Sequence, residues 1–154
     1  MLKVQTVKKQ LESFFKTNQY RYMYMNNKIK TLSLPVYLLG LNIISDENKE
    51  IAKITTMVSI FPSSHTICFE CLNLYHADEQ ESSEVLRKVN LVNNFSFPGT
   101  FTLKKDGSVT YCCYVDYTHS SKIHNDVIMS VIDSIPPAYF IFSDIIKDDK
   151  ELEY

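Results

Sequence analysis

Residues 90–116 read NLVNNFSFPGTFTLKKDGSVTYCCYVD, and this stretch decides the fold. Its first residues continue the spacing of a helix and carry Asn90 and Asn93 near the helix end. The remainder alternates through two strands around the turn at 104–107, whose Asp-Gly dipeptide is typical of a tight hairpin. The stretch therefore predicts a helix joined to a β-hairpin by the two asparagines, with a binding role for their amides as the alternative.

The residues before this stretch predict one helix, a block of strands and a second helix. Apolar residues at helical spacing predict an amphipathic first helix that ends near Thr17-Asn18. Period-2 alternation and turn residues predict strands at 20–25, 29–34, 36–44, 51–61 and 66–74, with a turn at Asn26-Asn27. Pro35 is expected to break a strand or to lie on an edge. Asp78 is expected to cap the second helix.

The residues after the hairpin predict further helix. Ser120 or Ser121 is expected to cap a third helix, and Pro136-Pro137 is expected to stop or kink it, because proline lacks the helix donor. Pro137 then restarts a last, mostly apolar helix. The acidic tail at 148–154 is expected to fray.

The order of these elements predicts the fold class. A block of strands rather than a strand–helix alternation favours an α+β fold, with a mostly antiparallel sheet and helices on one face, in the order α-β(several)-α-β-β-α. The chain has 154 residues, 45% hydrophobic and 22% charged, which suits one globular domain over residues 1–147.

Charge and motif content exclude several classes of function. The net charge is −2 and the sixteen Lys and Arg residues are spread along the chain, so no nucleic-acid partner is expected. There is no signal-peptide core and no run of about 18 apolar residues, which favours a soluble cytoplasmic protein without a membrane partner. Three glycines allow no phosphate-binding loop, and no nucleophile elbow occurs, so neither an enzyme nor a cofactor is expected.

Four cysteines and four histidines are the obvious candidates for chemistry. Cys68-x-x-Cys71 and Cys112-Cys113 lie in predicted strands, where residues at odd separation point to opposite faces. The thiols of each motif should therefore diverge, which favours ordinary core or surface cysteines over a zinc or redox site. No metal site is expected from the histidines, which lack ligand spacing, at His65, His76, His119 and His124.

Two apolar surfaces are candidates for binding a partner. Tyr20, Tyr22 and Tyr24 share one face of the first strand, with Met23 and Met25 on the other. One face should pack on helices while the other meets a partner, unless the strand is central and covered on both sides. The second candidate is the apolar stripe of the second helix, formed by Val85, Leu86, Val89 and Val92.

The deciding stretch also carries a family resemblance. A helix ending in Asn-x-x-Asn leads into Gly-x-Phe-x-Leu-x-x-Asp-Gly-x-Val, at positions Asn90, Asn93, Gly99, Phe101, Leu103, Asp106, Gly107 and Val109. This resembles the YbjN-like bacterial family, whose fold is that of type III secretion chaperones. The resemblance implies a homodimeric, non-enzymatic module that binds a protein partner through an apolar sheet or helix surface, or that serves in regulation. A small-ligand or enzymatic module and an accessory subunit of a larger assembly are the alternatives.

Overall fold

The structure is a computed structural model that describes residues 3–29, 32–44 and 49–147. Within these ranges the chain forms three helices and one antiparallel sheet of six strands in the order β1-β2-β3-β4-β6-β5. The elements are α1 (Val4–Thr17), β1 (Tyr22–Ile29), β2 (Leu32–Ile44), β3 (Glu50–Phe61), β4 (Thr66–His76), α2 (Ser82–Val92), β5 (Thr100–Leu103), β6 (Ser108–Asp116) and α3 (Asn125–Lys147). The α+β class and the predicted element order are confirmed.

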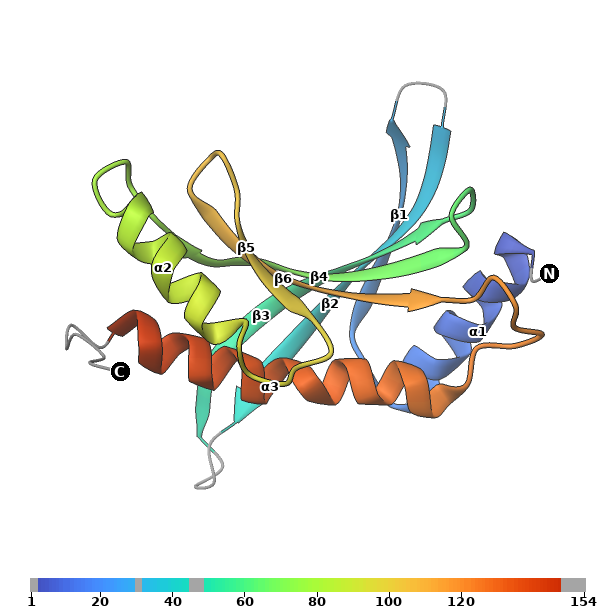
Figure 1. Cartoon of the computed structure of the whole chain (residues 1–154). Coiled ribbons are helices and arrows are strands. Elements are labelled where there is room, and N and C mark those ends of the chain that lie inside the picture. The colour runs from blue at the N-terminus through green and yellow to red at the C-terminus, as the bar shows by residue number, and fades with distance from the viewer. Residues whose placement is uncertain (1–2, 30–31, 45–48, 148–154) are drawn as a thin grey trace.

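All three helices lie on one face of a twisted, curved sheet (Figure 1). α1 presents an apolar stripe to the sheet because Val7, Leu11, Phe14 and Phe15 recur at helical spacing, and all four are buried. α3 packs against β4 and β6, and α2 fills the angle between α3 and β5. Within the described ranges, no helix lies over the opposite face of the sheet.

Strand alternation divides the side chains between a helix-covered face and an open face. Val58, Phe69 and Cys113 lie opposite one another on β3, β4 and β6, and all three are buried beneath the helices. Phe101 of β5 stacks on Phe142 of α3 with ring centroids 4.9 Å apart. These contacts belong to one continuous apolar core.

The junction between α2 and the hairpin is held by Asn93, one of the two asparagines predicted to form it. The Asn93 amide donates to the Phe101 carbonyl at 2.9 Å, and its oxygen accepts from the Phe101 N–H at 2.8 Å. Asn90 is exposed and makes no comparable contact within the described chain. The prediction that Asp78 caps α2 was wrong, because the helix begins at Ser82 with Glu81 at its cap position. The Asp78 carboxylate instead accepts from the N–H groups of Gln80 and Glu81 in the turn before the helix.

The prediction of a separate strand at 29–34 after a turn at Asn26-Asn27 was wrong. β1 runs through both asparagines to Ile29, and β2 begins at Leu32. Asn26 pairs with Pro35 in the ladder between β1 and β2. Pairing of β2 with β3 begins only at Val36, so Pro35 pairs with β1 alone. A proline is tolerated at such a position because the strand needs no backbone donor on its unpaired side.

The prediction that Pro136-Pro137 stops the third helix and that Pro137 restarts another one was also wrong. α3 begins at Asn125, not at Ser120 or Ser121, and continues through both prolines to Lys147. The prolines remove the donors for the carbonyls of Ile132 and Asp133. These two residues line an open cleft of about 530 Å³. Burial of Ile132, Ile135 and Ala138 against the sheet holds the helix together across the defect.

α3 is also long and apolar enough, by length and composition alone, to cross a bilayer. In the structure its inward residues, Ile128, Val131, Ile135 and Phe142 among them, belong to the core. A core helix of a globular domain has the same composition, so this helix gives weak evidence of a membrane span. The predicted frayed tail at 148–154 lies outside the described residues.

Candidate functional site

The open face of the sheet is the surface that the helices leave without cover. Two rows of directly opposed residues cross it from β1 to β6. Opposed residues on antiparallel strands share one face and lie close enough for their side chains to touch. The first row is Met23, Leu38, Met57, Glu70 and Cys112, and the second is Met25, Val36, Ser59, Cys68 and Tyr114.

Exposure varies sharply across the open face. Met23 is 62% exposed and Tyr114 is 66% exposed, at opposite ends of the two rows. Val36, Ser59 and Cys68, in the middle of the second row, are buried although no helix covers them. The surface offers accessible apolar groups at both sides and a close-packed centre.

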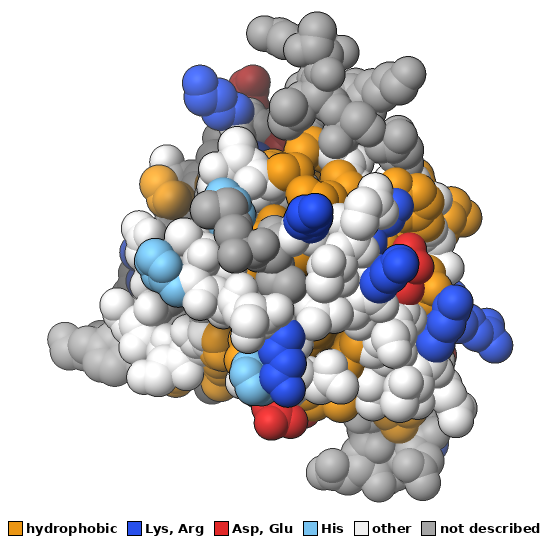
Figure 2. All heavy atoms as spheres, turned by 90° about the vertical axis from the view of Figure 1, so that its right-hand side faces the viewer, with side chains coloured by type: hydrophobic (Ala, Val, Ile, Leu, Met, Phe, Trp, Pro, Cys, Tyr) orange, Lys and Arg blue, Asp and Glu red, His pale blue; other side chains and the backbone are white. Residues whose placement is uncertain are grey.

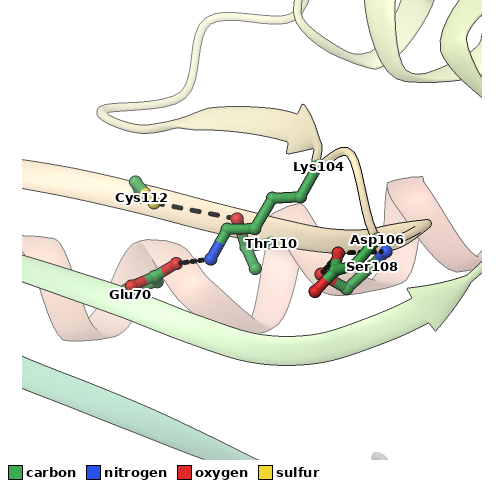
Figure 3. A network of polar contacts seen from close by, with 6 residues as sticks. All are labelled: Glu70, Lys104, Asp106, Ser108, Thr110 and Cys112. Atoms are coloured by element: carbon green, nitrogen blue, oxygen red, sulfur yellow. Dashed lines mark hydrogen bonds and ion pairs between the residues drawn. The ribbon is translucent and has the colours of Figure 1, made fainter.

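One ion pair lies on this face. Lys104 extends from the end of β5 across β6 and its ammonium contacts the Glu70 carboxylate of β4 (Figure 3). The bond to Glu70 raises the pKa of Lys104, and the partial burial of the ammonium opposes that shift. The turn that places Lys104 is fixed by Asp106, whose carboxylate accepts from the N–H of Ser108 at 3.0 Å and from its hydroxyl at 2.6 Å.

Cys112 lies beside this ion pair and next to a second thiol. It is directly opposite Glu70, and Cys68 is its diagonal neighbour on β4. A hydrogen bond from the Cys68 thiol lowers the pKa of Cys112, and the Thr110 hydroxyl, 3.9 Å from its sulfur, and the Lys104 charge act in the same direction. The same hydrogen bond together with burial raises the pKa of Cys68. The sheet thus makes a polarised thiol pair from residues distant in the sequence.

The other two cysteines form a second diagonal pair on the helix-covered face. Cys71 lies 3.5 Å from the Thr56 hydroxyl, and Cys113 lies 4.0 Å from the Ser134 hydroxyl of α3. Burial raises the pKa of Cys71 to about 12 and raises that of Cys113 as well. Both thiols are enclosed beneath the helices and almost without solvent contact, so this pair is part of the core. The prediction that the thiols diverge within Cys68-x-x-Cys71 and within Cys112-Cys113 is confirmed.

The histidines do not converge on a ligand or a metal. His65 occupies a turn with φ +52° and packs edge-on against Tyr117, with ring centroids 5.7 Å apart. His76 is at the end of β4, while His119 and His124 lie in the segment before α3. Within the described ranges no three His, Cys, Asp or Glu side chains are grouped as a metal site requires.

The structure separates the predicted partner-binding residues from the open face. Tyr20, Tyr22 and Tyr24 point toward the helix side: Tyr20 and Tyr22 contact Phe15 of α1, and Tyr24 contacts Lys8. Val85, Val89 and Val92 of the α2 stripe are buried in the core. Only Tyr24 and Leu86 of the predicted set remain substantially exposed, at 41% and 48%.

Charged side chains do not form a basic surface on the side of the molecule shown in Figure 2. Lys and Arg side chains are scattered there between apolar and uncharged ones. The cleft beside α3 carries Arg21 and Lys53, and Asp133 lies with them. This mixed charge suits a small polar ligand better than a nucleic-acid backbone, which needs many aligned cations.

The sequence did not single out the residues that matter most on the open face. Glu70, Lys104, Met57 and Tyr114 had no motif of their own. Strand parity could have placed Cys68 with Glu70, and Cys112 with Tyr114, on common faces. Nothing local in the sequence indicates that β4 is the neighbour of β6, and that pairing brings the two sets together.

Comparison with protein-family models and with curated proteins finds no match to this chain. The fold and the site therefore define only a class, an α+β protein with an open antiparallel sheet backed by helices.

Proposed function

We propose that this protein is a non-enzymatic protein-binding or regulatory module that engages a protein partner through the open face of its sheet. The observation that carries the proposal is the accessible apolar surface at the two sides of that face, with Met23 and Tyr114 each more than 60% exposed. Methionine and tyrosine are enriched where proteins meet, because methionine adapts its shape and tyrosine adds a large rigid surface.

The centre of the face would give such an interface its orientation. The Glu70–Lys104 pair is flanked by apolar residues of both rows, so a partner must match one charge pair inside an apolar surround. Matched charges in an interface fix its register more than they add affinity. The proposal moves the contact surface from the tyrosines to the methionine side of β1.

The YbjN-like resemblance, a homodimeric state and a cytoplasmic location are part of this proposal. They rest on the motif in residues 90–116 and on the composition of the chain. An accessory-subunit role needs the same kind of apolar face, with the partner being the remainder of an assembly.

Charge substitutions at the two exposed sites test the proposal. Met23→Glu and Tyr114→Glu should each weaken partner binding or self-association by about 2 kcal/mol, roughly 30-fold, if the two residues are interface anchors. Leu86→Glu on α2 is the matched control, because Leu86 is a similarly exposed apolar residue on the helix side. Light scattering measures self-association, and co-purification from native cells identifies the partner for affinity measurement. Equal affinities for the wild type and both open-face variants would contradict the proposal.

A small-ligand function is the second candidate, and the cleft beside α3 favours it. Its volume of about 530 Å³ lies in the range of ligand sites, and Arg21, Lys53 and Asn42 offer polar contacts. A thermal-shift screen of metabolites should then show a stabilising ligand whose effect is lost in Arg21→Ala and kept in Met23→Glu.

A further inference from the structure

We propose that Cys112 is a site of covalent thiol oxidation, with Cys68 as its resolving partner, and that the two close a reversible disulfide across the open face. The proposal does not depend on the protein-binding function, because it rests on the arrangement of β4 and β6 alone. It concerns two residues that the apparent cysteine motifs of the sequence do not pair.

The position of the two thiols favours their reaction with each other. Cys112 and Cys68 lie on the same face of adjacent antiparallel strands as diagonal neighbours. Cys112 is partly exposed, whereas Cys68 is 7% exposed beside its register partner Tyr114. A dissolved oxidant therefore meets Cys112 first, and Cys68 is in position to react second.

The groups around the Cys112 sulfur stabilise its thiolate form. The groups that face Cys112 are Cys68 and Glu70 on β4, Lys104 after β5, and Thr110 and Tyr114 on β6. Donation from Cys68 and Thr110, together with the Lys104 charge, stabilises the Cys112 thiolate against the opposing effects of Glu70 and of burial. The thiolate is the reactive form of cysteine, so this thiol should react well before the two core thiols.

The chemistry needs a two-electron oxidant of the hydrogen peroxide class. The Cys112 thiolate attacks one peroxide oxygen, so that an S–O bond forms, the O–O bond breaks and hydroxide leaves to be protonated to water. The Cys68 sulfur then attacks the Cys112 sulfur, the S–S bond forms, and the S–O bond breaks. The Cys68 proton leaves with that oxygen as a second water, so the pair loses two electrons and the peroxide gains them.

The strand spacing accounts for reversibility. Diagonal neighbours lie about 7–8 Å apart, whereas the Cα atoms of a disulfide lie about 4.4–6.8 Å apart, so closure shifts β4 along β6 by roughly 1 Å. The ladder between these strands is irregular directly beyond Cys71, and Asn73 has φ +53°, so β4 has room to adjust there. A disulfide formed under strain is readily reduced, and a labile bond of this kind suits regulation.

Labelling of the native, reduced full-length protein provides the first test. The wild type carries its own control, because Cys113 adjoins Cys112 but is buried on the opposite face. Under limiting iodoacetamide, peptide mass spectrometry should show Cys112 alkylated at least about tenfold faster than Cys113. The pH midpoint for Cys112 should rise in Cys68→Ala, because the donor to the thiolate is lost. Equal labelling of Cys112 and Cys113, or an unchanged midpoint, would overturn the proposal.

Oxidation provides the second test. With hydrogen peroxide near stoichiometry, the wild type should give an intramolecular crosslink between the peptides of Cys68 and Cys112 that dithiothreitol reverses. In Cys68→Ala the oxidation should end at a Cys112 sulfenic acid, which dimedone traps. Cys112→Ser should form neither the crosslink nor the dimedone adduct. A bridge between Cys71 and Cys113, or crosslinks between molecules only, would refute the assignment. Circular dichroism checks that each variant is folded. If a variant is not folded, the presence or absence of the Cys68–Cys112 crosslink in the wild-type peptide map tests the proposal.

Discussion

Asn93 shows how one side chain fixes a junction between two elements. Its amide satisfies both the N–H and the C=O of Phe101 at the start of β5. Asn93→Ala leaves both backbone groups without that partner, so the free energy of unfolding should fall by about 1–3 kcal/mol. Urea denaturation measures this loss. Asn94→Ala is the control, since Asn94 is exposed and adjacent, and a similar loss in both variants would show that the clamp is not the cause.

Replacement by phenylalanine should affect the free energy of unfolding differently at Tyr117 and at Tyr111. Among the described residues, the Tyr117 hydroxyl is buried without a hydrogen-bond partner, whereas the Tyr111 hydroxyl accepts from the Gly99 N–H at 3.0 Å. Tyr117→Phe should therefore leave the free energy of unfolding unchanged or raise it. Tyr111→Phe should lower it by about 1–2 kcal/mol because the Gly99 donor loses its partner. Thermal and urea unfolding of the two variants would contradict this account if Tyr117→Phe were the more damaging.

Gly99 and Gly40 form another matched pair at the residue scale. A Cβ at Gly99 would lie 2.5 Å from the Cys113 sulfur and 2.6 Å from the Cys112 carbonyl oxygen, whereas a Cβ at Gly40 would lie 3.8 Å from a Lys53 side-chain carbon. Gly99→Ala should destabilise the protein by about 1–3 kcal/mol through crowding. Gly40→Ala should be neutral or slightly stabilising, because it restricts the unfolded chain. Chemical denaturation compares the two, and equal effects would argue against close packing at Gly99.

At the scale of elements, α3 is the clearest case of tertiary packing overriding local preference. Pro136-Pro137 removes two helix donors, yet the helix continues because its inward face is buried along the sheet. The sequence pattern correctly predicted the two missing N–H donors, but it wrongly predicted that the helix would end there. Replacement of a proline by a residue that has an N–H donor should therefore raise the free energy of unfolding.

Replacement of Pro137 tests this interpretation. Pro137 is exposed on the outer side of α3, so Pro137→Ala restores a donor without disturbing the core. The free energy of unfolding should rise by about 1–2 kcal/mol, after subtraction of the entropy that proline removes from the unfolded chain. Pro98→Ala in the loop before β5 should instead lower it by less than about 1 kcal/mol. Urea denaturation measures whether each substitution raises or lowers the free energy of unfolding. A lower value for Pro137→Ala would contradict the interpretation that the proline weakens α3.

At the scale of the whole molecule, one core joins all three helices to the sheet. The buried cluster includes Phe15 of α1, Val89 of α2, and Ile135 and Phe142 of α3. A single core predicts a single cooperative transition. Unfolding followed by far-ultraviolet circular dichroism and by tyrosine fluorescence should therefore give coincident curves, because tyrosines are distributed along the chain. Separate midpoints would show that the part around α1 and the part around α2 and α3 unfold independently.

The sequence by itself determined the α+β class, the order of the helices and strands, the Asn93 junction and the divergence of the thiols within each cysteine motif. These follow from short-range physics: the helical and strand periods, turn residues and the alternation of strand faces act over a few neighbouring residues. The continuity of β1 and α3, the exposure of the methionine side rather than the tyrosine side, and the meeting of Cys68 with Cys112 were decided only by the tertiary structure. Each depends on which strand or helix lies alongside, and burial against distant segments outweighs local preference at those points.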